Sequence, residues 1–320
     1  MFIGIDIGGT KCSVSKGIFH ENRFELCDRV QIKTEHASPQ KMLGALSELV
    51  AELATESIQA IGISCGGPLD SKRGVILSPP NLPGWGKIEI VRYFEETFSV
   101  PVGLQNDANA CALAEWKFGA GIGCRNLIFL TFGTGLGAGL ILDGRLYSGT
   151  NDMAGEVGHM RLEPFGPVGY GKSGSFEGFC SGSGIAQIGK MKALEQLQQG
   201  GEVSFCAGYE ELDKISAKTI ADSAECGNAD AIEVYEICAK KLGAGLAVLV
   251  DLLNPERIII GSIFVRSRNL LWETTHRVLK EESLPRSFDV CKVVPAALSE
   301  QIGDYAALAV AENKWREISK

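Results

Sequence analysis

Apolar and polar positions alternate in short runs over the first part of the chain, as they do in β-strands. The first run is Phe2–Ile7, and the runs Cys12–Ile18 and Phe24–Ile32 follow it at the spacing of an antiparallel meander. After Ser38, apolar residues recur at helical spacing up to the strand-like run Ala60–Ile63. The pattern therefore predicts hairpins followed by a strand, helix, strand alternation.

The same pattern begins again near the middle of the chain. An amphipathic helix over residues 88–98 and a strand at Val102–Leu104 lead into an alanine-rich helix that ends near Gly119. Leu127–Phe132 is a second strongly apolar strand that leads into glycines, and an Asp-Gly turn within residues 140–147 predicts a hairpin. The chain thus makes a strand, a glycine-rich turn and an antiparallel return twice.

The second half of the chain is predicted to be mainly helical. A long loop over residues 164–178 precedes helices over residues 185–198, 229–253, 269–282 and 304–315. The apolar runs Ile258–Ile260 and Val290–Val294 are typical of buried parallel strands between such helices. This alternation over 320 residues predicts an α/β protein of about two domains. Because no charged or low-complexity linker separates the halves, we expect a cleft between closely packed domains.

Composition and charge exclude several classes of protein. Apolar residues make up 45% of the chain and charged residues 22%, which excludes global disorder. The net charge of −8 argues against broad binding to nucleic acid or to an anionic membrane. The 39 glycines far outnumber the 11 prolines without a collagen-like repeat, so they indicate sharp turns or close approaches to a ligand.

Cysteine usage and the start of the chain predict a cytoplasmic protein. The ten cysteines are scattered singly, without a paired framework, which is typical of reduced and mostly buried thiols. Residues 1–6 enter an apolar strand at once, without the pattern of a signal peptide. The most apolar later stretch, Leu242–Leu253, is interrupted by glycines and is too short for a bilayer span.

Two glycine-rich turns follow strands and are candidates for phosphate binding. In Asp6–Lys11 the glycines come at the end of the first strand, with a hydroxyl and an ammonium group just beyond them. Asp6 can hold Mg²⁺ through water. A plain β-turn with a solvated lysine would explain Gly8-Gly9 if it stood alone. Thr131–Gly139, however, has the same order of an apolar strand, glycines with a hydroxyl residue, and a return strand. Two such turns favour a nucleotide clamp, in which backbone N–H groups take the place of basic side chains.

Two other motif matches compete with this interpretation. Gly133-x-Gly135-x-x-Ala138 loosely fits the dinucleotide fingerprint, but that fingerprint must open a helix and here a hairpin is predicted. Gly62-x-Ser64-x-Gly66 fits the nucleophile elbow of hydrolases, which also requires a following helix. Because Gly66-Gly67-Pro68 is a poor helix start, Ser64 is interpreted as a serine at the end of a strand.

Polar side chains that could bind a sugar occur together in two places along the chain. Asn106 and Asp107 stand between a strand and a helix, where either can cap the helix and Asp107 can instead serve as a general base for a sugar hydroxyl. Glu156, His159 and the later Glu177 add hydrogen-bonding groups of the kind that a buried polyol needs. A structural Glu–His pair is the alternative, although the glycines that flank His159 favour a loop at a cleft.

Taken in order, six segments resemble the ROK family of sugar kinases and sugar-responsive repressors, within the actin/hexokinase-like ATPase superfamily. They are Asp6–Lys11, Gly66–Pro68 with Ser78–Trp85, Asn106–Ala110, Gly133–Gly137, Gly155–His159 and Asn254–Gly261. The resemblance covers nearly the whole chain. It implies two actin-like (ribonuclease H-like) domains of mixed sheets flanked by helices, with an interdomain cleft. We expect a smaller domain over residues 1–118, joined by the helix 304–320, and a larger domain over residues 119–303.

The resemblance also implies a role for each candidate residue. Asp107 would be the base that takes the proton from the sugar hydroxyl as that hydroxyl attacks the γ-phosphate of ATP. The residues implied to hold the sugar are Gly67, Asn81, Asn106, Asp107, Glu156, His159 and Glu177. Those implied to handle ATP and its Mg²⁺ are Asp6, Gly8, Gly9, Thr10, Lys11, Gly133, Thr134, Gly135 and, near the adenosine, Gly261. Ser262 stands where a second glycine is usual in the family.

The chain departs from the family at a metal site. Many members bind a structural zinc through a histidine and three cysteines, but here the cysteine positions hold Val168, Tyr170 and Ser175. Three soft ligands are then missing, so we expect no structural zinc and a loop held by packing of Val168, Tyr170 and Phe176. The repressors carry a DNA-binding helix-turn-helix before the first phosphate motif, and nothing precedes Asp6 here that could form one, which favours an enzyme.

The sequence therefore predicts an ATP-dependent hexose kinase, with the 6-hydroxyl of glucose as the expected acceptor. N-acetylmannosamine, N-acetylglucosamine, fructose, mannose and allose stay open as acceptors, and so does a non-catalytic sugar sensor. The expected partners are a hexose and ATP, with no nucleic acid and no membrane, and a homodimer is expected because family members are commonly dimers.

Overall fold

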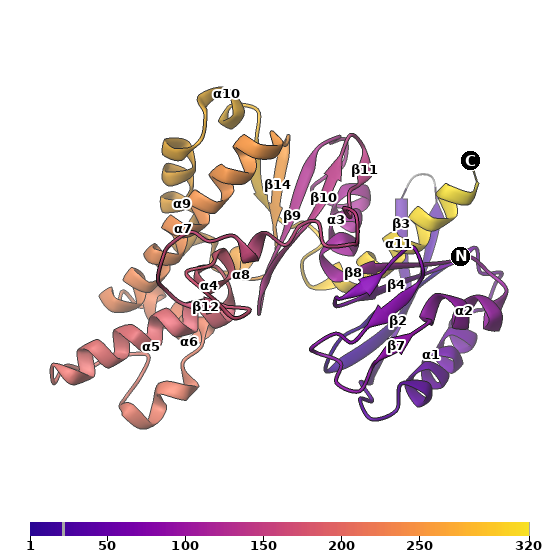
Figure 1. Ribbon diagram of the computed structural model, residues 1–320, viewed down its shortest axis with the longest axis horizontal. Coiled ribbons are helices and arrows are strands. Elements are labelled where there is room, and N and C mark those ends of the chain that lie inside the picture. Colours follow the sequence, from indigo (N-terminus) through magenta and orange to yellow (C-terminus); the bar gives the residue numbers. More distant parts are fainter. Residues whose placement is uncertain (21–22, 320) are drawn as a thin grey trace. The chain divides into compact units, whose positions relative to one another are not determined.

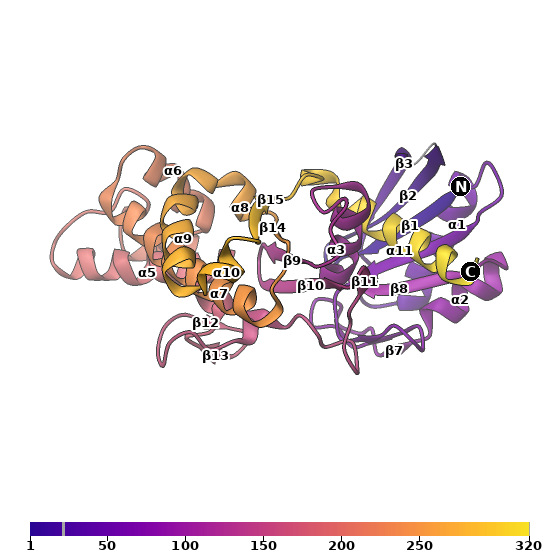
Figure 2. The ribbon, with the colours of Figure 1, turned by 90° about the horizontal axis from the view of Figure 1, so that it is seen from above.

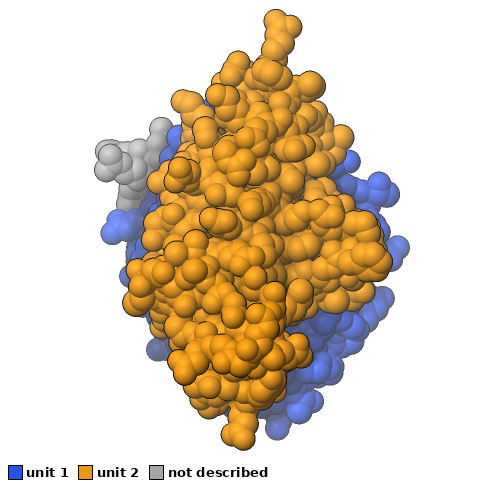
Figure 3. Space-filling model, turned by 90° about the vertical axis from the view of Figure 1, so that its left-hand side faces the viewer, with its two compact units in different colours: residues 1–129, 139–154, 297–320 blue, residues 130–138, 155–296 orange. Residues whose placement is uncertain are grey.

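The computed structural model describes residues 1–20 and 23–319, and the chain forms two compact units (Figures 1 and 3). Unit 1 contains residues 1–129, 139–154 and 297–320, and unit 2 contains residues 130–138 and 155–296. The chain therefore passes between the units after Phe129, Ala138, Ala154 and Ala296.

A five-stranded mixed sheet forms the centre of unit 1, in the order β3-β2-β1-β4-β8. Its strands are β1 (Phe2–Ile7), β2 (Lys11–His20), β3 (Arg23–Lys33), β4 (Ala60–Cys65) and β8 (Val102–Asn106). β1, β2 and β3 form the expected antiparallel meander, whereas β4 and β8 continue parallel to β1. The carboxyl ends of β1, β4 and β8 therefore meet at one edge of the sheet.

Helices cover this sheet on both faces. They are α1 (Pro39–Leu53), α2 (Ile90–Phe98), α3 (Asp107–Phe118) and α11 (Ile302–Ile318), the last after a short 3-10 helix, η3 (Ser299–Gln301). Strand alternation turns Ile3, Ile5 and Ile7 into one core with the apolar faces of α1 and α2, while Phe2 packs in a second cluster with Leu308 and Ala311 of α11. α11 and the pair α1 and α2 lie on opposite sides of the sheet (Figure 1). α11 lies directly on the sheet, because a Cβ on Gly62 would come within 2.2 Å of the main-chain nitrogen of Ala311.

Residues 69–88 contain a small antiparallel sheet. Its strands are β5 (Leu69–Asp70), β6 (Val75–Leu77) and β7 (Lys87–Ile88). Since β5 and not a helix follows β4, Ser64 does not stand in a nucleophile elbow, as the sequence indicated.

The second five-stranded sheet has the order β11-β10-β9-β14-β15. Its strands are β9 (Leu127–Phe132), β10 (Leu136–Leu142), β11 (Arg145–Leu146), β14 (Arg257–Ile260) and β15 (Lys292–Pro295). β10 and β11 form the predicted Asp-Gly hairpin, with Asp143 and Gly144 both at positive φ. β14 and β15 are parallel, as expected, but only β14 is buried, over its residues Ile258, Ile259 and Ile260. The prediction of a buried strand at 290–294 is wrong in that respect, because β15 is the edge of its sheet and Val290 lies before it, 56% exposed.

Helices make up most of unit 2 (Figure 2). They are α4 (Phe176–Phe179), α5 (Gly182–Gln198), α6 (Ala217–Glu225), α7 (Ala229–Leu253), α8 (Ile263–Arg266), α9 (Arg268–Glu282) and α10 (Pro285–Phe288). Besides β14 and β15, the described part of unit 2 contains the 3-10 helices η1 (Val157–His159) and η2 (Tyr209–Lys214) and a hairpin of β12 (Val168–Gly169) and β13 (Lys172–Ser173). The predicted loop 164–178 therefore contains a hairpin and the start of a helix.

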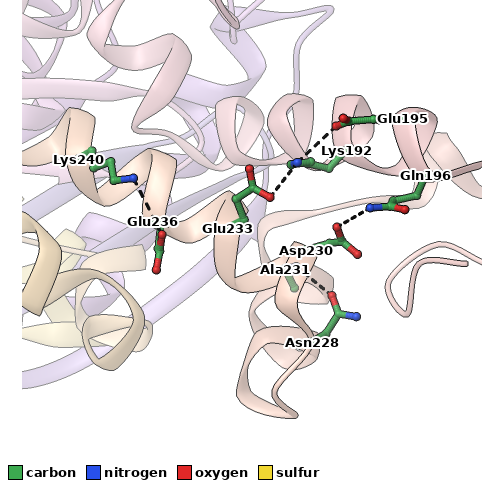
Figure 4. A network of polar contacts seen from close by, with 9 residues as sticks. All are labelled: Lys192, Glu195, Gln196, Asn228, Asp230, Ala231, Glu233, Glu236 and Lys240. Carbon is green, nitrogen blue, oxygen red and sulfur yellow. Dashed lines mark hydrogen bonds and ion pairs between the residues drawn. The ribbon is translucent and has the colours of Figure 1, made fainter. Parts of the chain in front are cut away.

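Polar contacts fasten α5 to α7 along their exposed faces (Figure 4). Lys192 bridges to Glu233 at 2.8 Å, and the side-chain amide of Gln196 donates to Asp230 at 2.9 Å. Asn228 caps α7 by accepting from the N–H of Ala231 at 2.9 Å. The start of α7 is thus fixed both by its own cap and by α5.

Two further expectations concern cysteines and membranes. Six of the ten cysteines are buried, which confirms the expectation of mostly buried cysteines. Within the described part of the chain, no helix is both long and apolar enough to cross a bilayer.

Candidate active site

The first group of candidate residues gathers at the carboxyl ends of β1, β4 and β8 in unit 1. Asp6 is the second-last residue of β1 and lies opposite Ser64 of β4. Gly67 follows two residues after the end of β4. Asn106 ends β8, and Asp107 is the first residue of α3. Parallel strand order thus brings together residues that lie far apart in the sequence.

The carboxyl group of Asp6 lies in an unusual electrostatic environment. Burial raises its pKa from 3.8 to about 7, and the nearby carboxylates of Asp304 and Asp107 add to the shift, while a hydrogen bond from Ser64 and the charge of Arg29 oppose it. Asp304, a buried residue in the first turn of α11, was not predicted from the sequence. No local motif marks this position, and only the packing of α11 on the sheet places it beside Asp6.

Asp304 is itself held by three groups of the sheet. Its carboxylate accepts hydrogen bonds from the hydroxyls of Ser13 at 3.2 Å and Ser15 at 2.8 Å. Arg29 forms an ion pair with it at 2.9 Å. These contacts fix a negative charge next to Asp6.

The first glycine turn leaves backbone donors open. Gly8 donates its N–H to the carbonyl of Lys11 at 3.0 Å, and a Cβ on Gly9 would lie 2.6 Å from the main-chain oxygen of Asn81. Within residues 1–20 and 23–319, no group bonds to the N–H of Gly9 or of Thr10. The side chains of Thr10 and Lys11 are exposed. Open amides in a tight turn beside a hydroxyl and an ammonium group suit a phosphate.

Asn81 lies against two glycine turns of unit 1. Its main-chain oxygen contacts Gly9, and its side-chain amide lies 3.0 Å from the position of a Cβ on Gly66. The loop that carries Asn81 is anchored by Trp85, which is buried and donates its indole N–H to the carbonyl of Glu35 at 3.3 Å. The predicted sugar residue Asn81 therefore lies next to the first glycine turn, with its amide accessible.

Asn106 and Asp107 make different contacts at the start of α3. Asn106 is the N-cap of α3 and accepts from the N–H of Asn109 at 2.7 Å. Asp107 accepts from its neighbour Ala108 at 2.8 Å and remains open to solvent. Although solvent reaches Asp107, the many protein atoms around it reduce its hydration, and this raises the pKa of its carboxyl above the ordinary 3.8. Capping by Asn106 is confirmed, and Asp107 bonds only to the backbone beside it at the start of the helix.

The second group of candidate residues lies in unit 2 around the glycine turn between β9 and β10. The start of α5 packs against this turn: Gly182 donates to the carbonyl of Gly133 at 2.8 Å, and the hydroxyl of Ser183 donates to that of Thr134 at 3.1 Å. In the part of the chain that the structure describes, the N–H groups of Thr134 and Gly135 have no protein partner. The sequence analysis missed this role of α5, although Ser181-Gly182-Ser183 is a helix-start signal.

Glu177 fastens the same turn. Its carboxylate accepts from the N–H of Leu136 at 2.9 Å and lies 2.7 Å from the position of a Cβ on Gly135. A Cβ on Gly158 would lie 3.1 Å from the Cβ of Glu177, so the Glu156–His159 turn packs against it. The side chains of Glu156 and His159 are exposed. Unit 2 therefore brings Glu156, His159 and Glu177 next to the second glycine turn.

Gly261 also lies near this turn. It follows β14 and donates its N–H to the carbonyl of Leu130 in β9 at 3.0 Å. Its neighbour Ser262 has a φ of 50°, and its hydroxyl lies 3.6 Å from the position of a Cβ on Gly133. The Asn254–Gly261 segment thus ends beside the second glycine turn.

The loop at the expected zinc position differs in part from expectation. Phe176 is fully buried, as predicted, but Val168 is 45% exposed and Tyr170 is 78% exposed, so the prediction that these two pack the loop is wrong. The physical reason is the β12–β13 hairpin, which places Tyr170 in its turn with a φ of 43°. Among the described residues, no three or more His, Cys, Asp or Glu side chains cluster so that they could hold a metal ion.

Side-chain to backbone hydrogen bonds hold this loop instead. Gln187 of α5 donates to the carbonyl of Val168 and accepts from its N–H, both at 2.9 Å. Lys172 donates to the carbonyl of His159 at 2.6 Å, and Arg161 donates to that of Ser173 at 2.7 Å. Ser175, at a former cysteine position, caps α4 by accepting from the N–H of Gly178 at 3.1 Å. The loop is thus tied directly to α5 and to the backbone of His159.

These features match a known family along almost the whole chain. The sequence model of the ROK family matches residues 2–314. The chain belongs to the ROK family.

Similar proteins within this family fall into two kinds. The chain is 30% identical to a glucokinase of Halalkalibacterium halodurans over 94% of its own length and 92% of that protein. It is 29% identical to the DNA-binding transcriptional dual regulator NagC of Escherichia coli over 88% of its length and 68% of that protein.

The structure resembles a ROK family glucokinase from Streptomyces griseus, solved in complex with glucose and AMPPNP. The TM-score is 0.76 at 29% identity, with 98% of this chain and 99% of that one covered. The fold is therefore the two-domain actin-like fold of the ROK sugar kinases, as the sequence predicted.

Proposed function

We propose that this ROK protein is an ATP-dependent hexose kinase that transfers the γ-phosphoryl group of ATP to the 6-hydroxyl of glucose. The observation that carries the proposal is the carboxylate of Asp107, which is open to solvent at the start of α3, while Asn106 supplies the N-cap of that helix. The similarity to glucokinases supports glucose as the acceptor.

Asp107 would act as the general base. A sugar hydroxyl is far too weakly acidic to ionise near neutral pH, so its attack on phosphorus is helped by an acceptor that takes the proton as the new P–O bond forms. Reduced hydration raises the pKa of the Asp107 carboxyl, which makes it a stronger proton acceptor than an ordinary aspartate. The bond between the β,γ-bridging oxygen and the γ-phosphorus breaks, and ADP leaves.

The other candidate residues would bind and orient the two substrates. In unit 1 the sugar residues are Gly67, Asn81 and Asn106, and in unit 2 they are Glu156, His159 and Glu177. Their amide, carboxylate and imidazole groups offer both donors and acceptors, which sugar hydroxyls require. The turns Gly8–Lys11 and Gly133–Gly135 would bind phosphates through their open N–H groups, and Gly261 would lie near the adenosine.

The residues present fit a divalent cation next to the first glycine turn. Burial and two neighbouring carboxylates raise the pKa of Asp6 to about 7, so a cation would offset crowded negative charge there. Asp6 would hold Mg²⁺ through water. Mg²⁺ bound with ATP neutralises charge on the phosphates.

Replacement of Asp107 by asparagine tests the proposal. We expect turnover to fall by about 10²–10⁴-fold, because the amide cannot take the proton, while glucose binding is largely kept. A coupled ATPase assay measures turnover, and calorimetry with glucose measures binding. Asp143→Asn, in the exposed β10–β11 turn, is the matched control. Near-normal turnover of Asp107→Asn would remove Asp107 from the mechanism.

A panel of sugars in the same assay tests the acceptor. Glucose should give the highest kcat/KM, and a higher value for N-acetylmannosamine, N-acetylglucosamine, fructose, mannose or allose would reassign the substrate. The similarity to the regulator NagC favours one further candidate, a non-catalytic sugar sensor. ATP turnover with any sugar of the panel contradicts that candidate. A homodimer and a cytoplasmic location complete the proposal.

A further inference from the structure

Ser262 has a backbone conformation that ordinarily belongs to glycine. It stands two residues after the end of β14, with φ 50° and ψ −110°. Residues that carry a Cβ rarely adopt such a positive φ, and strained residues of this kind gather at sites that bind ligands. A serine at a position where the family usually has glycine therefore points to a use for its hydroxyl.

The hydroxyl of Ser262 lies between Arg266 and the second glycine turn. It accepts a hydrogen bond from the guanidinium of Arg266 at 3.2 Å. It also lies 3.6 Å from the position of a Cβ on Gly133, the first glycine of the turn. Ser262 thus connects a positive charge to a turn whose N–H groups are candidates for phosphate binding.

The start of α8 is packed firmly beside this turn. Ile263, the first residue of α8, lies with its Cδ1 3.4 Å from the position of a Cβ on Gly182. Gly182, at the start of α5, donates to the carbonyl of Gly133 at 2.8 Å. The glycine turn and the starts of α5 and α8 therefore form one packed group within unit 2.

Arg266 lies at the exposed end of α8. Ile263 and Phe264, at the other end of this helix, are buried and anchor it. The position of Arg266 beside the turn is therefore fixed by packing as well as by the hydrogen bond to Ser262. A guanidinium has several N–H donors, and Ser262 accepts from one of its nitrogens. The bond to Ser262 still leaves donors with which Arg266 can reach a ligand.

The second glycine turn has no cationic residue of its own. Residues 131–139 contain neither lysine nor arginine, whereas the first turn ends in Lys11. The open N–H groups of Thr134 and Gly135 are dipoles without a net charge. Hydrogen bonds from arginine to phosphate are charge-assisted and about twice as strong as those between neutral groups. Arg266 would thus supply to the second turn what Lys11 supplies to the first.

We propose that Arg266 binds ATP by donating from its guanidinium to the phosphate chain, and that Ser262 is the residue that positions it. The inference rests on the proposed kinase function. Two other roles are possible for the same contact. The bond between Ser262 and Arg266 can serve only to close the single turn of α8, or Arg266 can contact the adenosine part of the nucleotide, and the test separates these roles.

The probes are AMPPNP with Mg²⁺ and adenosine, both titrated into the full chain. Calorimetry measures AMPPNP directly and adenosine by displacement. Arg266→Gln should weaken the binding of AMPPNP by about tenfold and leave that of adenosine unchanged, because adenosine has no phosphate. Arg266→Lys should recover part of the loss, since it keeps the charge without the planar fork. Arg268→Gln is the matched control, because the Arg268 guanidinium lies over the ring of Trp272, 5.4 Å from its centroid, and both ligands should bind it as they bind the parent.

Ser262→Gly tests the positioning role. It removes the hydroxyl and the strain together, so it should raise the midpoint of urea denaturation while it weakens AMPPNP binding several-fold. In the Arg266→Gln background the same change should cause no further loss of affinity, because the two residues act as one unit. A purely structural bond would not raise stability and lower affinity in the same variant.

Four results would overturn the inference. Unchanged AMPPNP binding by Arg266→Gln would remove Arg266 from the site, and an equal loss for adenosine would remove it from the phosphates. Unchanged AMPPNP binding by Ser262→Gly, or losses that simply add in the double variant, would remove the positioning role of Ser262. Failure of the parent chain to bind AMPPNP at all would instead contradict the proposed kinase function, and this inference with it.

Discussion

At the scale of single residues, the N-cap of α3 links stability to the candidate site. Asn106 caps this helix, as Asn228 caps α7 at a distance from the candidate residues along the chain. Asn106→Ala and Asn228→Ala should each lower the free energy of unfolding by about 1 kcal/mol, measured by urea denaturation. Only Asn106→Ala should raise the KM for the sugar as well. If the two variants leave the same KM, Asn106 serves α3 alone.

The raised pKa of Asp6 predicts a pH dependence of stability. The carboxyl ionises near 3.8 in the unfolded chain and near 7 in the fold, so the folded state binds more protons between these values. Its contribution to stability is therefore present below about pH 4 and is lost as the pH rises to about 7. Asp6→Asn should become more stable than the parent chain over this window, by an amount on the order of a few kcal/mol.

This comparison requires urea denaturation at several pH values in EDTA, without Mg²⁺ or nucleotide. Asp143→Asn, whose carboxylate is 86% exposed, should keep the profile of the parent. Parallel profiles for Asp6→Asn and the parent would show that Asp6 ionises at the same pH in both states.

At the scale of elements, the contact between α11 and the first sheet depends on glycine. A Cβ on Gly62 would lie 2.1 Å from the carbonyl oxygen of Ala307 and 2.2 Å from the nitrogen of Ala311, both backbone atoms of α11. Gly62→Ala should therefore lower the free energy of unfolding by about 1–3 kcal/mol or more, since α11 must move. Gly44→Ala in α1 meets no atom within 4 Å and should instead stabilise the protein by about 0.5–1 kcal/mol. Thermal melting of both variants measures the contrast.

Gln187 predicts a second effect at this scale. Its two hydrogen bonds tie the backbone of Val168 to α5, next to the hairpin that supports His159 through Lys172. Gln187→Ala should speed hydrogen exchange over residues 161–175 by about tenfold, which corresponds to roughly 1.4 kcal/mol, and should raise the KM for the sugar. Gln196→Ala removes a bond from the same helix to Asp230 and should leave this loop unchanged. Equal exchange in the two variants would contradict the role of Gln187.

At the scale of the whole molecule, the chain combines an acidic net charge with candidate phosphate turns and one basic groove. The turns offer the backbone N–H groups of Gly9, Thr10, Thr134 and Gly135. These main-chain groups carry no net charge, so the net charge of the chain does not report their presence. Basic side chains, among them Lys72, Arg145 and Lys314, instead line a groove at the edge of β8. The net charge of the chain therefore predicts neither the glycine turns nor the basic groove, because both depend on where the fold places a few backbone N–H groups and basic side chains.

Much of the fold could be predicted from local pattern. The alternation over residues 2–33 and the helical spacing before β4 depend on neighbours along the chain, and the structure confirms β1, β2, β3 and α1 at these places. α6 was missed because it is a short helix of nine residues, and its capping box, Ser216 with Thr219, differs from the common Ser/Thr and Glu/Gln pattern. Val168 and Tyr170 were placed wrongly, because apolar character does not show which side of a hairpin turn faces solvent.

The sequence by itself determined the order of the elements, the positions of both glycine turns and the residues that stand at the ends of strands. These features follow from local backbone preferences and from side-chain periodicity. Only the tertiary structure decided that Asp304 raises the pKa of Asp6, that the start of α5 and Glu177 hold the second glycine turn, and that basic side chains of separate elements meet at β8. Such contacts join residues that are distant in the chain, and they arise only when the packing of sheets and helices fixes their positions.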